Sequence, residues 1–331
     1  MDKQGFRKML QGLYLDEQAI KNTFAISERF EEYLNDKKPT TETAWDFSKI
    51  LIKEKNNDFR SYLALLFYCQ FIKQDDMYVG FMELVDGGEV GDNLYKSVAE
   101  KFGKEVRDEV FKGKGKIPYG IPSPEKPAYL HPIIKKLQKT IGTRACKELL
   151  SDCLRDLPDR MFLDDRKEYL KINDIDEFLI KKKENFLENL KNCQKEKRLF
   201  FVQEITDDAL DLVRGNPEMG AGKREGNKIV ETKIPYMTKK YLAEKDPTLK
   251  RYYACHCPWS RDVIKNGNLV PAQIFCHCSA GFMKKSWEFI FKQPLKVDVL
   301  ETVLNGGEYC RFAVHLPEEA LKKTKKEKQH A

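Results

Sequence analysis

The sequence predicts an α+β protein in which an all-helical N-terminal domain precedes a C-terminal domain made of an antiparallel sheet, helices and a cysteine-rich site. Apolar residues recur at helical spacing through the first third of the chain, whereas strand-like alternation begins only near residue 199. Glycine and proline interrupt the helical pattern between these regions. The 331 residues are long for one compact domain, and a hydrophobic content of 41% is sufficient for a core in each.

Residues 1–111 are predicted to form the helical domain. Apolar residues from Phe24 to Tyr33 follow helical spacing, a second helix begins at Thr41, and a third covers Phe59–Ile72. Two more helices are expected around Met77–Leu84 and Leu94–Phe111, because Gly87 and Gly88 separate them. The stretch FEEYLNDKKPTTETAWDFSKILIKEKNNDFRSYLALLFYCQFI resembles the helical core-binding domain of tyrosine recombinases. The catalytic Arg, His and Tyr set of that family has no counterpart downstream, so we do not expect recombination.

Residues 112–130 contain three glycines and four prolines, a density that predicts an interdomain linker. A further helical segment is expected over 131–198, in which His131 is interpreted as a surface or capping residue. Four cysteines in helical patterns are interpreted as buried or incidental thiols: Cys69, Cys146, Cys153 and Cys193.

The C-terminal domain is predicted over 199–318. RLFFVQEI, KIVETKIP and RYYACHCP are strand-like, and DDALDLVRG and SAGFMKKSWEFIFKQ are helical. Between them, the glycine-rich residues 215–227 predict a flexible hairpin or an active-site lid. The last element, LKVDVLETVLNGGEYCRFAVHLP, alternates apolar residues around Gly306 and Gly307, which predicts a β-hairpin.

Charge and hydropathy restrict the classes of partner. The net charge is +7, but residues 321–331 hold five Lys and one Glu, so the rest of the chain is nearly balanced. We therefore expect a disordered basic tail at 319–331 and no nucleic-acid-binding face. No apolar run reaches the length of a membrane span, and the N-terminus lacks the apolar core of a signal peptide. The expected protein is soluble and cytoplasmic, with no sequence signal for an oligomeric state.

Two Cys-His-Cys triplets give the strongest chemical signal. Cys255, His256 and Cys257 are followed, eighteen residues later, by Cys276, His277 and Cys278. In a reducing compartment such clustered thiols are metal ligands or reactive groups more often than disulfides.

If both triplets are extended, each pair of cysteines points to one face, because residues i and i+2 share a face of a strand. Four sulfur atoms could then hold zinc, with Cys310 or His315 able to replace one of them. An iron–sulfur cluster is a less favoured alternative. A metal-free thiol site, in which Cys257 or Cys276 is a nucleophile, is a third.

The region from Leu199 to Pro317 resembles the 4-vinyl reductase-type domain and the L-2-amino-thiazoline-4-carboxylate hydrolase-like family. The resemblance lies in CHCPWSR, in FCHCSAGFMKKSWEFIF and in the closing hairpin VLETVLNGGEYCRFAVHLP. It implies a small α+β module that binds small hydrophobic ligands, often with a cysteine-ligated zinc. The metal ligands that it implies are Cys257, Cys276, Cys278 and Cys310.

Three functional hypotheses follow, in order of preference. The first is a zinc-binding protein that binds or senses a small molecule in an aromatic pocket. The second is a metal- or thiol-dependent hydrolase of a small C–N or C–S substrate. Its acid–base candidates are His256, His277, Glu288 and Asp262, with Arg261 as a further catalytic candidate. The third is a DNA-associated regulator. A ligand, including a substrate carboxylate, would be held by residues from the set Lys223, Arg224, Trp259 and Arg261.

Overall fold

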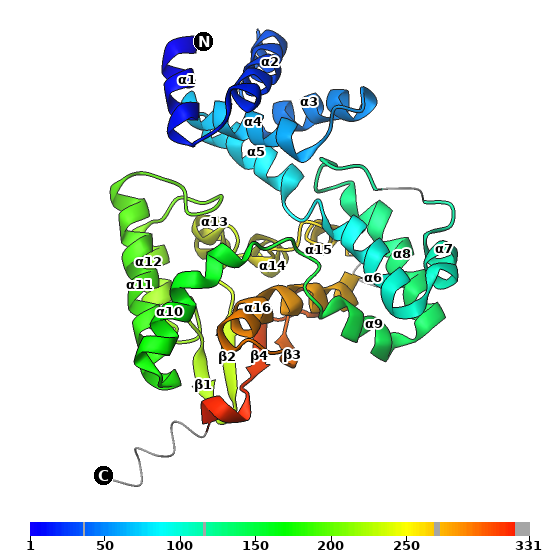
Figure 1. Ribbon diagram of the computed structural model, residues 1–331, viewed down its shortest axis with the longest axis vertical. Helices are drawn as coiled ribbons and strands as arrows, with labels where there is room; N and C mark the ends of the chain where they lie inside the picture. The colour runs from blue at the N-terminus through cyan, green and yellow to red at the C-terminus, as the bar shows by residue number, and fades with distance from the viewer. Residues whose placement is uncertain (36, 115–116, 268–271, 322–331) are drawn as a thin grey trace. The chain divides into compact units, whose positions relative to one another are not determined.

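The computed structural model describes residues 1–35, 37–114, 117–267 and 272–321, which form two compact units (Figure 1). The N-terminal unit comprises residues 1–92 and 113–129, and the C-terminal unit comprises 93–112 and 130–331. The predicted mixture of helices and a small antiparallel sheet is confirmed. Within the described residues, no helix is both long enough and apolar enough to cross a bilayer.

The N-terminal unit is helical, as expected. It contains α1 (Lys3–Gly12), α2 (Glu17–Leu34), α3 (Thr41–Lys53), α4 (Phe59–Phe71), α5 (Asp75–Val85) and the first residues of α6 (Val90–Phe102). Asp16, Thr40 and Asp58 begin α2, α3 and α4, because each side chain accepts a hydrogen bond from a backbone N–H of the first turn. The apolar faces of these helices share one aromatic core, which includes Phe6, Phe30, Phe47, Tyr68 and Phe81.

The proline- and glycine-rich segment is packed rather than extended between the units. Ile121 and Ser123 are buried, and the carbonyl oxygen of Gly120 accepts a hydrogen bond from Ser48 at 2.7 Å. Residues 113–129 therefore belong to the N-terminal unit, whereas the predicted domain division treats 112–130 as a separate linker. Proline removes backbone donors and ends helices, but it does not prevent burial when side chains supply the hydrogen bonds.

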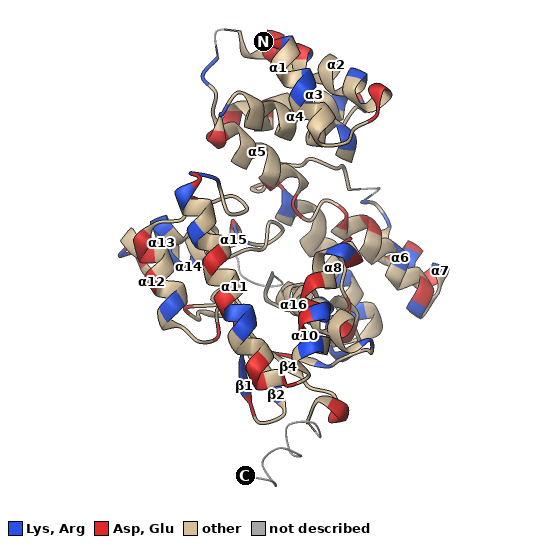
Figure 2. Cartoon of the chain, turned by 60° about the vertical axis from the view of Figure 1, so that its left-hand side comes forward, with Lys and Arg blue, Asp and Glu red and all other residues tan. Residues whose placement is uncertain are grey.

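The C-terminal unit places its helices before and around a four-stranded sheet. The helices before the sheet are α7 (Lys104–Phe111), α8 (Lys126–Ile141, continuous from the other unit), α9 (Thr143–Leu150), η1 (Asp159–Phe162), α10 (Leu163–Ile172), α11 (Ile175–Lys195) and α12 (Asp207–Gly215). Basic and acidic residues both occur along α11, as the colouring of Figure 2 shows.

The sheet is antiparallel throughout and has the order β1–β2–β4–β3. Its strands are β1 (Lys223–Glu225), β2 (Lys228–Thr232), β3 (Val297–Glu301) and β4 (Arg311–His315). In β2 and β4, Val230 is opposite Ala313, and a bulge interrupts the pairing of β3 with β4 between Val299 and Glu301. The glycine-rich residues before β2 form the predicted hairpin, and the closing hairpin prediction is also confirmed.

One long helix, α16 (Cys276–Phe291), packs against this sheet (Figure 1). Its Trp287 is fully buried in a cluster with Ile229 of β2 and Val314 of β4. The other short elements near the sheet are α13 (Thr238–Ala243), α14 (Pro247–Ala254), α15 (Val263–Asn266), η2 (Ala272–Phe275) and η3 (Val303–Asn305). The loop that follows α14 and the start of α16 carry the two cysteine triplets.

Three local predictions were wrong. RYYACHCP is not a strand, because it forms the end of α14 and the loop after it. RLFFVQEI contributes only an isolated bridge between Phe200 and Gln203. The predicted tail begins too early: residues 318–321 are helical and Ala320 is buried, while the remainder, 322–331, lies outside the described residues.

Candidate cysteine site

The first triplet follows directly after a helix. Asp246 begins α14 by accepting hydrogen bonds from the backbone N–H groups of Thr248 and Leu249, both at 2.8 Å, and Pro247 occupies the first turn. The helix ends at Cys255, whose backbone is extended. Cys257 then lies in a turn, since its carbonyl oxygen accepts a hydrogen bond from the N–H of Arg261 at 2.9 Å.

The second triplet forms the first turn of α16. Residues two apart on a helix are separated by about 200° around its axis, so Cys276 and Cys278 cannot share a face as they would on a strand. Cys276 packs in an apolar cluster with Cys255 and Cys310, and Cys257 lies at the edge of that cluster. Cys278 is also buried, but it faces Cys153 and Cys257, whose thiols affect its pKa. For this second triplet, the expected pairing of i and i+2 on one face was wrong.

Four of the thiols are close enough to influence one another. Burial raises the pKa of Cys255 well above its usual range, and the neighbouring Cys310, Cys257 and Cys276 raise it further. Burial likewise raises the pKa of Cys276, with Cys310 and Cys257 adding to the effect. All of these cysteines are free thiols. Three chain segments that are distant in sequence therefore bring their sulfur atoms into one buried region.

Several donors and one cation oppose the effect of burial. The backbone N–H of Cys257 lowers the pKa of Cys255, and that of Val303 lowers the pKa of Cys310. Thr302 lowers the pKa of Cys276, although its buried hydroxyl has no hydrogen-bond partner of normal geometry in the described residues. Lys233 lowers the pKa of Cys276, Cys278 and Cys310. These groups would stabilise thiolates, but burial has the larger effect on the pKa values and favours the protonated thiols.

The sulfur atoms do not surround a single point. No group of three or more His, Cys, Asp and Glu side chains stands in an arrangement that could hold a metal ion, as far as the described ranges extend. His315 is not part of the site, because its Nε2 lies 2.7 Å from Oδ2 of Asp298.

The two triplet histidines are occupied by other partners. Nε2 of His256 lies 2.5 Å from the carbonyl oxygen of Ile234, a geometry in which the ring nitrogen donates. Nδ1 of His277 lies 3.3 Å from Oγ of Ser151. Burial, with a smaller contribution from Lys147, lowers the pKa of His277 to about 4, so this imidazole is neutral at pH 7.

The other candidates are dispersed. Arg261 is buried, with its guanidinium 4.7 Å from the ring centroid of Tyr236 and 5.3 Å from that of Tyr252. Trp259 is also buried, and its carbonyl oxygen lies 3.2 Å from Nε2 of His131. His131 is therefore a half-buried residue inside α8 rather than a surface cap. The remaining candidates lie elsewhere: Asp262 directly precedes α15, and Lys223 and Arg224 are in β1, paired with Glu225 and Asp176.

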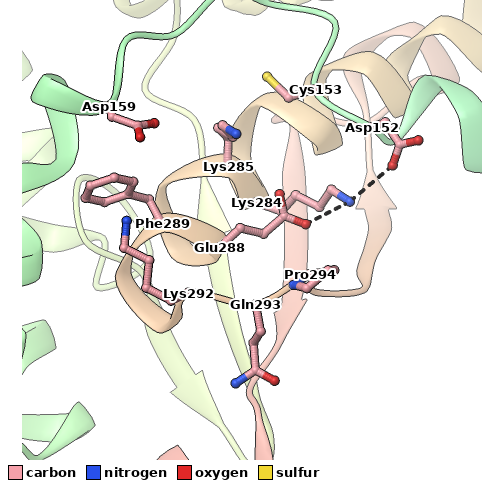
Figure 3. A pocket seen from close by; sticks show the side chains of 10 residues that line it. All are labelled: Asp152, Cys153, Asp159, Lys284, Lys285, Glu288, Phe289, Lys292, Gln293 and Pro294. Atoms are coloured by element: carbon pink, nitrogen blue, oxygen red, sulfur yellow. Dashed lines mark ion pairs between the residues drawn. The ribbon is translucent and has the colours of Figure 1, made fainter. Parts of the chain in front are cut away.

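Glu288 lines a separate open cavity of about 560 Å³ beside α16 (Figure 3). Its carboxylate lies 3.1 Å from Nζ of the buried Lys284, which also lies 3.6 Å from Asp152. Cys153 lines the same cavity and lies close enough to Cys278 to affect its pKa. The proximity of Cys153 to Cys278 depends on how the chain between α9 and η1 packs against α16. The sequence spacing gave no signal for this contact.

Comparison with known proteins does not place the chain in a family. No family model, no curated protein and no solved structure matches it. The site is therefore interpreted from its own geometry and chemistry.

Proposed function

We propose that the C-terminal unit is a zinc-binding module in which the thiolates of Cys255, Cys257, Cys276 and Cys310 bind one ion. The observation that carries this proposal is that three buried cysteines and the partly buried Cys257, all free thiols, gather in a single region although they come from three separate chain segments. Zinc prefers four ligands in a tetrahedral arrangement, and thiolates are among its strongest protein ligands.

Electrostatics favour a cation at this position. Burial and mutual repulsion make four thiolates very unfavourable without a compensating charge. A divalent ion reverses this balance, because it deprotonates the thiols that coordinate it. The buried hydroxyl of Thr302 fits the same interpretation, since it lies beside Cys276 and could donate a hydrogen bond to a thiolate.

Binding requires the cysteine side chains to turn. As they stand, no three potential ligands in the described part of the chain are arranged around one point. A cysteine side chain changes direction by rotation about one bond, Cα–Cβ, which has three staggered positions. The proposal therefore requires rotamer changes of the cysteine side chains but no movement of α14, α16 or β4.

The role that we propose for the ion is structural. His256 and His277 already have hydrogen-bond partners, and Glu288 is paired with Lys284. These partners favour a structural ion over a hydrolytic one, because His256, His277 and Glu288 already interact with groups other than the thiols. An ion bound to four cysteines would connect the loop after α14, the start of α16 and the start of β4. Closed four-ligand sites of this kind contribute directly to folding free energy.

The test is metal analysis of the purified protein together with substitution by Co²⁺. We expect one zinc per chain, and a cobalt spectrum with thiolate charge-transfer bands and the d–d bands of a tetrahedral site. Cys255→Ala and Cys310→Ala should each abolish stoichiometric binding. Cys193→Ala is the matched control, because Cys193 is a buried thiol that packs in a different cluster. Wild-type protein without metal, or undiminished binding by the Cys255 and Cys310 variants, would falsify the proposal.

A further inference from the structure

A second cavity in the C-terminal unit, of about 390 Å³, is lined by none of the four proposed zinc ligands. Its lining comes from α8, α9, η2, α16, β3 and the last residue of η3, and α9 packs against α16 and η2 (Figure 1). The volume is in the range of pockets that bind small molecules. Because six elements of one unit contribute side chains, the cavity is part of the fold of that unit.

The charge of the lining is unbalanced. Lys147 contributes an ammonium group, and neither Asp nor Glu is among the lining residues. Lys147 also has no ion-pair partner within the ranges that the structure describes. The neighbouring Glu148 is paired with Arg144 at 3.0 Å. An ammonium group without a carboxylate beside it attracts an anion.

The remaining polar groups are uncharged. Gln138, Gln273 and Asn305 provide side-chain amides, and Thr143 provides a hydroxyl. Thr143 precedes Lys147 by four residues on α9, so both side chains lie on the same face of that helix. Amides and hydroxyls can each donate a hydrogen bond to an oxygen atom of a ligand.

His277 also lines the cavity. Nδ1 of its ring lies 3.3 Å from Oγ of Ser151. Ile274 and Val299 supply the apolar part of the lining. The cavity therefore offers one cation, several neutral donors and an apolar wall.

We infer that this cavity binds a small organic oxyanion with a single negative charge. Lys147 would hold the charged oxygen atoms, the amide and hydroxyl groups would orient them, and the body of the ligand would lie against Ile274 and Val299. The arrangement needs no metal ion, so the inference stands independently of the proposed zinc site.

The test uses benzoate as the probe and benzamide, its uncharged analogue, as the control ligand. Isothermal titration calorimetry on the full chain should detect benzoate binding to the wild type and much weaker binding of benzamide. Lys147→Gln should weaken benzoate binding about tenfold, the effect expected for loss of one hydrogen bond to a charged group. Lys139→Gln is the matched control, because Lys139 is exposed on α8 and does not line the cavity.

Each other outcome contradicts the inference. If the wild type does not bind benzoate, or if Lys147→Gln binds it as tightly as the wild type, the cavity is not an anion site at Lys147. Equal affinity for benzamide would overturn the assignment of a charged ligand. The metal content of the same samples distinguishes the two proposals. Lys147→Gln should leave the zinc content unchanged, whereas a wild type without zinc would contradict the zinc proposal and not the anion proposal.

Discussion

Trp287 donates a hydrogen bond from its indole Nε1 to Oε1 of Glu231, and both side chains are buried where α16 packs on β2. The hydrogen bond favours the carboxylate, and Lys182 and Lys233 act in the same direction. Burial has the larger effect and raises the pKa of Glu231 to about 7 from its ordinary value of 4.5. Glu231 is therefore an acid that the folded protein keeps protonated under mildly acidic conditions.

This relationship predicts a specific pH dependence of stability. Between pH 4.5 and about 7 the folded chain retains a proton that the unfolded chain releases, so the free energy of unfolding falls as the pH rises through this window. The loss attributable to Glu231 should be about 3 kcal/mol. Glu231→Gln should remove this part of the pH dependence, because an amide oxygen can still accept the hydrogen bond from Trp287 without ionising.

Urea unfolding at pH 5 and at pH 8, followed by circular dichroism, measures the effect. Other groups also titrate in this range, so the relevant quantity is the difference in pH dependence between wild type and variant. Identical pH dependence in the two proteins would show that Glu231 ionises normally.

The sequence predicted the helices of the N-terminal unit and the closing hairpin because their signals are local. Apolar spacing marks α2 to α5, and alternating residues around Gly306 and Gly307 mark β3 and β4. The error at RYYACHCP has a local cause as well. The segment was predicted to be strand-like, although Asp246 and Pro247 form a helix-start signal that was present in the sequence.

The geometry of the candidate site was less predictable. Placement of Cys276 and Cys278 on a helix changes which sulfur atoms can meet, and that placement depends on α16 beginning three residues before the predicted helix. The proximity of Cys310 to Cys255 results from tertiary packing of η3 and the segment before β4 against the end of α14, which no residue spacing encodes. The same is true of Cys153, which was interpreted as an incidental thiol and lies near Cys278.

Lys183 should be a strong contributor to the stability of the C-terminal unit. Its Nζ donates to the carbonyl oxygens of Val213, Asn216 and Met219, at 2.5, 2.8 and 2.7 Å. It thereby joins α11 to the end of α12 and the loop that follows. Lys183→Met should lower the free energy of unfolding by about 2 kcal/mol, because three carbonyl groups lose a charged donor.

The matched control for this measurement is Lys181→Met on the same helix. Lys181 is exposed and forms only a surface ion pair with Glu184 at 3.4 Å, so its loss should cost less than about 0.5 kcal/mol. Chemical denaturation of both variants gives the comparison. Equal losses for the two lysines would mean that the contacts of Lys183 add nothing to stability.

Gly281 permits close packing between α16 and the chain after α9. A Cβ atom at this position would lie 2.7 Å from the carbonyl oxygen of Ser151 and 2.9 Å from that of Asp152. Since both obstacles are backbone atoms, Gly281→Ala should lower the free energy of unfolding by about 1–3 kcal/mol.

Gly215→Ala provides the contrast for that experiment. Gly215 ends α12, and a Cβ atom there would meet nothing within 4 Å. This substitution should be neutral or slightly stabilising, because alanine restricts the unfolded chain more than glycine does. Thermal unfolding of both variants tests the prediction, which fails if Gly281→Ala is as stable as the wild type.

The helical placement of the second triplet predicts that its two cysteines differ in metal binding. Cys276 packs with Cys255 and Cys310, whereas Cys278 is turned by about 200° around the axis of α16 and has Cys257 and Cys153 as its thiol neighbours. Cys276→Ala should therefore abolish stoichiometric zinc binding, and Cys278→Ala should retain it with an affinity within about tenfold of the wild type, a difference of about 1.4 kcal/mol.

Competition with a chromophoric chelator measures the zinc affinity of both variants and the wild type under identical conditions. The reverse result, retention by Cys276→Ala and loss by Cys278→Ala, would move the metal from Cys276 towards Cys278 and Cys153, with Cys257 near both positions. Equal loss in both variants would require the first turn of α16 to unwind on binding, since only an extended segment presents residues i and i+2 to one ion from the same face.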